Sequence, residues 1–290
     1  MKKYYLISSE ALKDGLLFRN EEDFKVGMNY VAILAAKYPG VIILVYILMS
    51  NHFHFFLLGT REEVEAFVNA FKKRYSSYYN RKYGVKEILR GNAVDFKEFS
   101  PDKESLRIGI AYVQMNCVAA NICSHPSQYP WGTGGVFFNR MNHSGRRVGE
   151  FSARKLTAIL HSNECDLPRD WVICDDGYVL PQNYVGIARV EGIFDSPKQM
   201  NYYLNNSSKA KRRLEMAEDH LPAFRDQTAM AALYDLCRSL FGKKEFRELA
   251  YDEKVELVRQ LRYRCSANAN QIARVCGISY EEVAKLMDGV

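Results

Sequence analysis

Length, composition and charge limit what this chain can be. Its 290 residues suffice for one large domain or two of ordinary size. Apolar residues form 48% and charged residues 26% of the sequence, a balance typical of a globular protein with a buried core. The net charge of +6 is compatible with a polyanionic partner but too small to indicate one by itself.

Membrane and disulfide-rich classes are disfavoured. The longest apolar stretch, VIILVYILM at 41–49, is far too short to span a membrane, and the opening MKKYYLISSE has no signal-peptide pattern. The seven cysteines include no Cys-x-x-Cys pair, which argues against a disulfide framework and a cysteine zinc site. We therefore expect a cytoplasmic protein with reduced cysteines and no membrane partner.

Residues 1–135 have the alternating pattern of an α+β domain. The β-branched and aromatic run at 41–59 contains the turn residues Ser50-Asn51, which predicts a β-hairpin. The other expected elements are strands at 4–9 and 92–99, and helices at 20–40, 60–84 and 100–122, the last capped by Ser100. This β-α-β-β-α-β-α order predicts a ferredoxin-like (RRM-like) antiparallel sheet with covering helices.

The character of the sequence changes after residue 135. The polar, glycine-bearing segment 136–151 predicts a linker, and residues 152–290 are expected to be mostly α-helical. In NQIARVCGISYEEVAKLM at 270–287, Ala273 is small enough for two helices to cross and Gly277 can make a turn, which predicts a helix-turn-helix.

The second helix of this motif is a candidate contact for double-stranded DNA. It would begin near Ser279 and Tyr280, carry Lys285, and lie in a major groove, supported by a helix at 251–265. A helical hairpin without DNA contact is the alternative.

Two histidines, His52 and His54, stand one residue apart in the apolar run LMSNHFHFFLL. Side chains at i and i+2 share one face of a strand, so both imidazoles should point to the same side of the sheet. Either ring alone would be read as a hydrogen-bonded core residue. Two neutral imidazoles so placed form half of a metal site.

The helix at 100–122 carries Tyr112 and Asn116 beside its apolar stripe. These residues are four apart and are therefore neighbours on the helix surface. Gly109, one turn before the tyrosine, would leave an opening for something bulky. Without the histidines, ordinary helix packing would explain this edge.

The histidine pair and the tyrosine-bearing helix together resemble a known family. NHFH at 51–54, AYVQMNCV at 111–118 and YPW at 129–131 resemble the single-tyrosine HUH transposases, and most closely the REP-associated tyrosine transposases and their insertion-sequence relatives. The resemblance covers residues 1–135. Cys117 stands where that family usually has proline.

This resemblance implies roles for four side chains. Tyr112 would be the nucleophile, and His52, His54 and Asn116 would bind Mg²⁺ or Mn²⁺, which can hold and polarise a phosphodiester oxygen. A tyrosine phenol is protonated near neutral pH, so a nearby cation would help it react. Attack on DNA would give a 5′-phosphotyrosine and a free 3′-OH, and a second 3′-OH could reverse the step and transfer the strand.

The same resemblance implies a substrate: a single-stranded DNA hairpin at the end of a mobile or repeated element. Members of the family act as monomers or as homodimers that exchange helices, and the sequence leaves both states open. It also leaves open whether Tyr112 acts in its own subunit.

A basic, tyrosine-rich segment at 71–92 is a second candidate contact for nucleic acid. Cations neutralise phosphates, and tyrosines stack on bases. The residues expected to bind are Lys72, Lys73, Arg74, Arg81, Lys82 and Arg90. A solvated helix face with half-buried tyrosines is the alternative.

Two other functions compete with a transposase. A domesticated DNA-binding regulator would keep the fold without cutting, and an RNA-binding protein would use an RRM-like sheet. Neither accounts for paired imidazoles beside Tyr112. We therefore expect a metal-dependent enzyme that nicks and transfers DNA strands.

Overall fold

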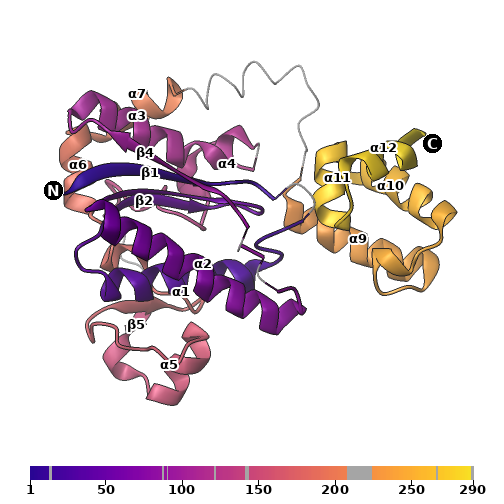
Figure 1. Ribbon diagram of the computed structural model, residues 1–290, viewed down its shortest axis with the longest axis horizontal. Coiled ribbons are helices and arrows are strands. Elements are labelled where there is room, and N and C mark those ends of the chain that lie inside the picture. Colours follow the sequence, from indigo (N-terminus) through magenta and orange to yellow (C-terminus); the bar gives the residue numbers. More distant parts are fainter. Residues whose placement is uncertain are drawn as a thin grey trace.

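A four-stranded antiparallel sheet forms the centre of the N-terminal part of the molecule (Figure 1). The computed structural model describes residues 1–12, 15–86, 88–89, 91–120, 122–140, 144–207, 224–265 and 267–288. The strands lie in the order β2-β3-β1-β4, and all neighbours are antiparallel. They are β1 (Lys3–Ser9), β2 (Ile42–Leu48), β3 (Phe53–Gly59) and β4 (Val94–Phe99). This is the ferredoxin-like order, so the predicted fold class is confirmed.

Helices α1 (Glu21–Lys37) and α2 (Arg61–Tyr83) cover one face of the sheet. Both begin with a capping box, at Asn20 and Thr60 respectively, in which side chain and backbone satisfy each other's hydrogen bonds. Helix α2 ends at Gly84, whose φ of 70° is the left-handed conformation that favours glycine. These local signals explain why the bounds of both helices could be predicted.

The packing of α2 defines the inner face of β3. Phe53 and Phe55 both contact Phe71 of α2, with ring centroids 5.1 and 5.4 Å apart. Because side chains alternate along a strand, His54, which lies between them, must face the other side of the sheet.

Helices α3 (Lys103–Gln114) and α4 (Asn116–Ala119) lie on that other side (Figure 1). The expected cap at Ser100 is wrong: α3 begins after Asp102, whose carboxylate accepts a hydrogen bond from the backbone N–H of Ser105 at 2.8 Å. The helix is also interrupted at Met115 rather than continuous to residue 122.

The hydrophobic core of the sheet extends much further along the chain than residue 135. Buried apolar side chains from Tyr5 to Leu204 form one cluster, and Phe137 and Val148 belong to it. Residues on both sides of 141–143 in the segment 136–151, expected as a linker, therefore pack into the core of the sheet. Among the described residues, the core of the sheet extends to Leu204.

The elements after α4 surround the sheet region. They include a second, two-stranded sheet, so residues 152–207 are less uniformly helical than expected. These elements are η1 (Pro126–Gln128), β5 (Gly145–Arg147), η2 (Val148–Glu150), α5 (Ala153–Leu160), β6 (Val172–Cys174), η3 (Pro181–Asn183), α6 (Ile187–Phe194) and α7 (Pro197–Asn205).

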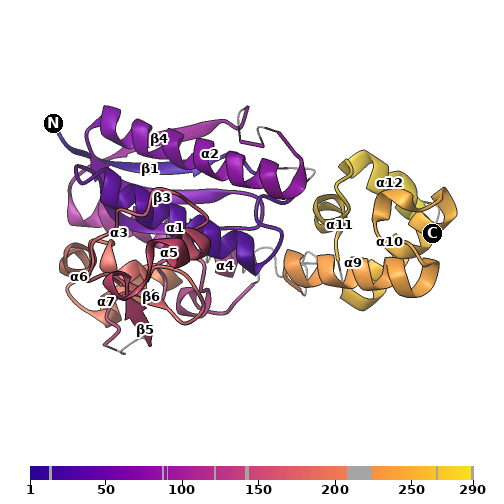
Figure 2. The same ribbon diagram turned by 90° about the horizontal axis from the view of Figure 1, so that it is seen from below.

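The C-terminal helices form a separate group with its own core, at one end of the molecule (Figure 2). They are α9 (Asp226–Phe241), η5 (Phe246–Glu248), α10 (Tyr251–Cys265), α11 (Ala269–Cys276) and α12 (Tyr280–Asp288). Helices α11 and α12 follow each other across a tight turn at Gly277, which has a φ of 66°. Leu16, from the N-terminal part, is buried in this second core and ties the two groups together.

Candidate functional site

The paired histidines lie on the face of the sheet that α3 covers. His54 is buried, at 5% exposure, and pairs across the sheet with Ser8 of β1. His52 precedes the first residue of β3 and is half-buried. The centroids of the two rings are 4.9 Å apart, with the rings nearly perpendicular. Since bonds from imidazole nitrogen to a metal are about 2 Å long, two rings this close can share one cation.

Asn51 fixes the tautomer of His52. The Nδ2 group of Asn51 donates to the carbonyl of Leu12 at 2.9 Å, which turns Oδ1 toward His52 Nδ1, also at 2.9 Å. An amide oxygen can only accept, so His52 carries a proton on Nδ1 and, when neutral, its lone pair on Nε2. His54 Nδ1 lies 2.9 Å from the hydroxyl of Ser8. Partners of this kind typically orient metal-binding histidines.

Tyr112 of α3 meets this pair. Its ring is 5.9 Å from the ring of His54, centroid to centroid, with an interplanar angle of 85°. The side chain is partly buried against the sheet core. Residues from a strand and from a helix much later in the chain are thus brought side by side.

Asn116 lies one turn after Tyr112, at the start of α4, and is 4% exposed. Its Nδ2 group donates to the carbonyls of Tyr112 at 2.9 Å and Val113 at 3.1 Å. A side-chain amide that bonds the carbonyl four residues earlier competes with the helix backbone, which explains the interruption at Met115. With both amide hydrogens engaged, Oδ1 is the atom that Asn116 can offer to a cation.

This donor set of two imidazole nitrogens and one amide oxygen fits a divalent cation of the Mn²⁺ or Mg²⁺ type. In the part of the chain that the structure describes, no cluster of three or more His, Cys, Asp or Glu side chains could hold a metal.

The space around Gly109 is filled rather than open. A methyl group on Gly109 would come within 3.0 Å of ring atoms of both Phe56 and Phe99. The expected opening for something bulky is therefore wrong, because these two rings occupy it. Glycine here lets α3 approach the sheet closely, and this approach brings Tyr112 to the histidines.

The YPW segment supports the same end of the sheet. The hydroxyl of Tyr129 donates to the carbonyl of Leu48 at 2.7 Å, and the N–H of Leu48 donates to the carbonyl of Trp131 at 2.8 Å. Burial raises the pKa of Tyr129 well above its ordinary value, so this phenol stays a hydrogen-bond donor. The segment thus holds the end of β2 just before the loop at 50–52.

The cations of α2 lie across the sheet from Tyr112. Arg74 donates to Ser162 at 2.8 Å, and Lys82 pairs with the fully buried Asp23 at 2.8 Å. Lys72 donates to the carbonyl of Asn92 at 2.6 Å, and burial lowers the pKa of its ammonium group. These three side chains therefore have polar partners within the folded chain.

Lys73 and Arg81 are exposed instead. Both line a groove of about 900 Å³ between α2 and residues 161–164. Arg90, also expected to bind nucleic acid, lies outside the described residues. In the C-terminal helices, Tyr280 and Lys285 are exposed, whereas Ser279 caps α12 by accepting from the N–H of Glu282 at 3.1 Å.

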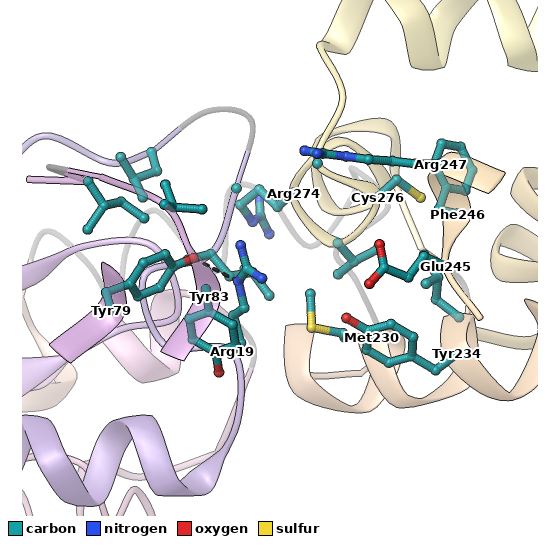
Figure 3. A pocket seen from close by; sticks show the side chains of 18 residues that line it. Arg19, Tyr79, Tyr83, Met230, Tyr234, Glu245, Phe246, Arg247, Arg274 and Cys276 are labelled. Atoms are coloured by element: carbon teal, nitrogen blue, oxygen red, sulfur yellow. Dashed lines mark hydrogen bonds between the residues drawn. The ribbon is translucent and has the colours of Figure 1, made fainter. Parts of the chain in front are cut away.

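A cleft of about 590 Å³ separates the sheet region from the C-terminal helices (Figure 3). Arg19 and Tyr83 stand on one wall, with the guanidinium 4.2 Å from the ring centroid, and Tyr234 and Arg247 stand on the other. Arg274 reaches in from α11 (Figure 3). No local sequence signal indicates this cleft, because its two walls are more than a hundred residues apart in the chain.

Comparison with known proteins gives a limited result. No family model matches the chain, and no curated protein matches it. Among solved structures, it is similar to the structure of a REP-associated tyrosine transposase bound to a REP hairpin, at 13% sequence identity and a TM-score of 0.36. The similarity covers 46% of this chain and 75% of that one.

The fold and site together define an α+β protein with a ferredoxin-like sheet, a histidine pair facing a tyrosine helix, and a helical C-terminal region. Within the described residues, no helix is long and apolar enough to cross a membrane.

Proposed function

We propose that this protein is a metal-dependent DNA transesterase that nicks single-stranded DNA and transfers the cut strand. The observation that supports it most directly is the contact between Tyr112 and His54, beside His52. A packing role for Tyr112 would not require an imidazole next to its ring that is itself paired with a second imidazole. A nucleophile that acts on a phosphodiester would require positive charge at this position.

The chemistry assigned to Tyr112 is a reversible transesterification. Its phenol loses a proton, and the oxygen forms a bond to phosphorus while the bond from phosphorus to the 3′ oxygen breaks. The leaving 3′ oxygen takes up a proton, which gives a 5′-phosphotyrosine and a free 3′-OH. Attack by a second 3′-OH restores the phenol and joins the strands without an external energy source.

His52, His54 and Asn116 would hold a divalent cation, Mg²⁺ or Mn²⁺. Such an ion, when bound, polarises the phosphodiester and offsets its negative charge. Asn51 would present Nε2 of His52 to the ion, since Nδ1 carries the proton. Asn116 would contribute Oδ1, because both hydrogens of its amide group donate to backbone carbonyls.

Nucleic-acid binding would use exposed cations outside this centre. Lys73 and Arg81 along the groove beside α2 are the candidates for single-stranded DNA, and Tyr280 and Lys285 of α12 are the candidates for double-stranded DNA. The natural substrate would be a hairpin that flanks a mobile or repeated element.

The test is a cleavage assay on labelled single-stranded oligonucleotides taken from the sequence that flanks the gene. We expect Mn²⁺-dependent cutting that Tyr112→Phe abolishes. A matched control is Tyr202→Phe, which removes the hydroxyl of an exposed tyrosine on α7 and should leave cutting intact.

The same assay separates the rival functions. Metal-independent binding without cutting, unchanged in Tyr112→Phe, would instead indicate a DNA-binding regulator. Tight RNA binding that survives EDTA and the change of both histidines to alanine would indicate an RNA-binding protein.

A further inference from the structure

A buried carboxylate joins the C-terminal helices to the loop that carries His52. Asp226, in the first turn of α9, is 7% exposed and accepts a hydrogen bond from the hydroxyl of Ser50 at 2.6 Å. Arg274 of α11 donates to both oxygens of this carboxylate, from Nε to Oδ2 at 3.0 Å and from Nη2 to Oδ1 at 3.1 Å. Gln271 of α11 donates to the same carboxylate at 3.0 Å.

Asp226 stays ionised although it is buried. Burial alone would favour the protonated form of Asp226, but the charge of Arg274 and the surrounding hydrogen bonds outweigh it and hold the pKa below its ordinary value. A two-point contact between arginine and carboxylate also fixes direction as well as distance. The hydroxyl of Ser50 therefore meets a carboxylate that is held in place.

The link continues from Ser50 to the histidine in two steps along the chain. The carbonyl of Ser50 accepts from the N–H groups of Leu17 and Phe18 at 2.8 and 2.9 Å, which leaves this residue little freedom. The next residue, Asn51, accepts from His52 Nδ1 and sets its tautomer. A shift at Ser50 would thus displace the group that orients His52.

We propose that Asp226 is a positioning residue for the His52 loop, so that the C-terminal helical region is a working part of the metal site. This inference rests on the proposed function, since it assigns the histidines to a cation. It predicts that the site loses affinity for a divalent cation when the Ser50–Asp226 hydrogen bond is removed, although neither residue would touch the ion.

The experiment compares two substitutions that each remove one hydrogen bond between the two regions. Ser50→Ala removes the bond to Asp226 and leaves the Asp226–Arg274 pair intact. Gln227→Ala removes the bond from Gln227 Nε2 to the carbonyl of Phe18, at 3.0 Å, and leaves the hydrogen bonds of Ser50 to Asp226, Leu17 and Phe18 in place. Full-length wild type and both variants are titrated with Mn²⁺ by electron paramagnetic resonance, and thermal unfolding verifies that each is folded.

We expect Ser50→Ala to weaken Mn²⁺ binding by at least about threefold, less than the 10–100-fold typical of a direct partner of a metal ligand. Gln227→Ala should bind Mn²⁺ like the wild type. Equal affinity in Ser50→Ala and wild type, or an equal loss in both variants, would overturn the proposal.

Amide hydrogen exchange of peptides over 48–55 gives a second readout that needs no metal. Faster exchange there in Ser50→Ala alone supports the link, and unchanged exchange refutes it. If the wild type binds no Mn²⁺ but exchange still rises in Ser50→Ala, the link stands and the proposed function fails. If Mn²⁺ binds equally in all three proteins, the proposed function stands and the positioning role fails.

Discussion

The ring of Tyr112 stands edge-on to the ring of His54, with centroids 5.9 Å apart, on the face of the sheet opposite to Phe53 and Phe55. This arrangement depends on strand alternation and on how closely α3 approaches the sheet. It is also the contact on which the proposed function rests.

The close approach of α3 depends on the absence of a side chain at position 109. Gly109→Ala should lower the free energy of unfolding by about 1–3 kcal/mol, because the added methyl group would overlap the rings of Phe56 and Phe99. Urea unfolding measures the loss. Gly192→Ala is a matched control within α6, where the new methyl group meets nothing within 4 Å and should be neutral or stabilising by up to about 1 kcal/mol. Similar losses in both variants would contradict the role of Gly109.

The orientation of His52 depends on the amide of Asn51. Asn51→Ala should reduce Mn²⁺ affinity by about 10–100-fold, because His52 loses the acceptor that holds its proton on Nδ1. Calorimetric titration with Mn²⁺ provides the measurement. His125→Ala changes a half-buried histidine whose Nδ1 contacts Ser127, and it should bind Mn²⁺ normally. If Asn51→Ala binds Mn²⁺ with wild-type affinity, Asn51 does not orient His52 for metal binding.

The exposed cations on α2 should affect DNA binding, whereas the cations with partners in the folded chain should not. Replacing both Lys73 and Arg81 by glutamine should weaken binding to single-stranded DNA. It should also reduce the steepness of log K against log salt by about 1.4, since each lost phosphate contact contributes about 0.7. Lys244→Gln, an exposed lysine in the C-terminal region, is the control. An unchanged salt dependence in the double variant would place the DNA elsewhere.

Lys82, by contrast, should matter for stability. Lys82→Gln removes the cation paired with Asp23, whose carboxylate is fully buried, and should cost about 1–3 kcal/mol in free energy of unfolding. Chemical denaturation of the variant measures this cost. If Lys82→Gln is as stable as the wild type but binds DNA more weakly, Lys82 is a DNA contact and not a stabilising residue.

The Asp226 carboxylate predicts a pH dependence of stability. Its pKa is lower in the folded chain than in the unfolded one, so its contribution to stability is present above the unfolded value of about 3.9 and disappears as the pH falls through the folded value. Asp226→Asn should therefore be less stable than the wild type between pH 5 and 7, and the difference should shrink below about pH 4. Urea unfolding across this range tests the sign. A difference that stays constant down to pH 3 would contradict it.

The sequence predicted those features that have local causes. Capping residues and Gly84 set the bounds of α1 and α2, and alternation in NHFH put both imidazoles on one face. The interruption at Met115 was missed because it arises from a side-chain hydrogen bond of Asn116 that competes with the helix backbone. The filled space at Gly109 depends on Phe56 and Phe99, which are distant in the chain.

Long-range packing accounts for the other differences. Nothing local in residues 136–140 and 144–204 indicates that they contribute to the core of the sheet, since their apolar side chains would suit a separate helical domain equally well. Asp226 and Ser50 likewise carry no motif, although SNHFH places Asn51 next to the first histidine and could have suggested its role. The opposite placement of the α2 cations and Tyr112 follows only once the sheet is assembled.

Identification of the covalent attachment site tests the central claim most directly. The wild-type protein would be incubated with single-stranded DNA from the flank of its gene and Mn²⁺, denatured, digested, and analysed by mass spectrometry. We predict a peptide in which Tyr112 carries a nucleotide through its 5′-phosphate, absent when Mn²⁺ is omitted and in His54→Ala. A nucleotide attached to another residue, or cleaved DNA without any adduct on Tyr112, would contradict the account.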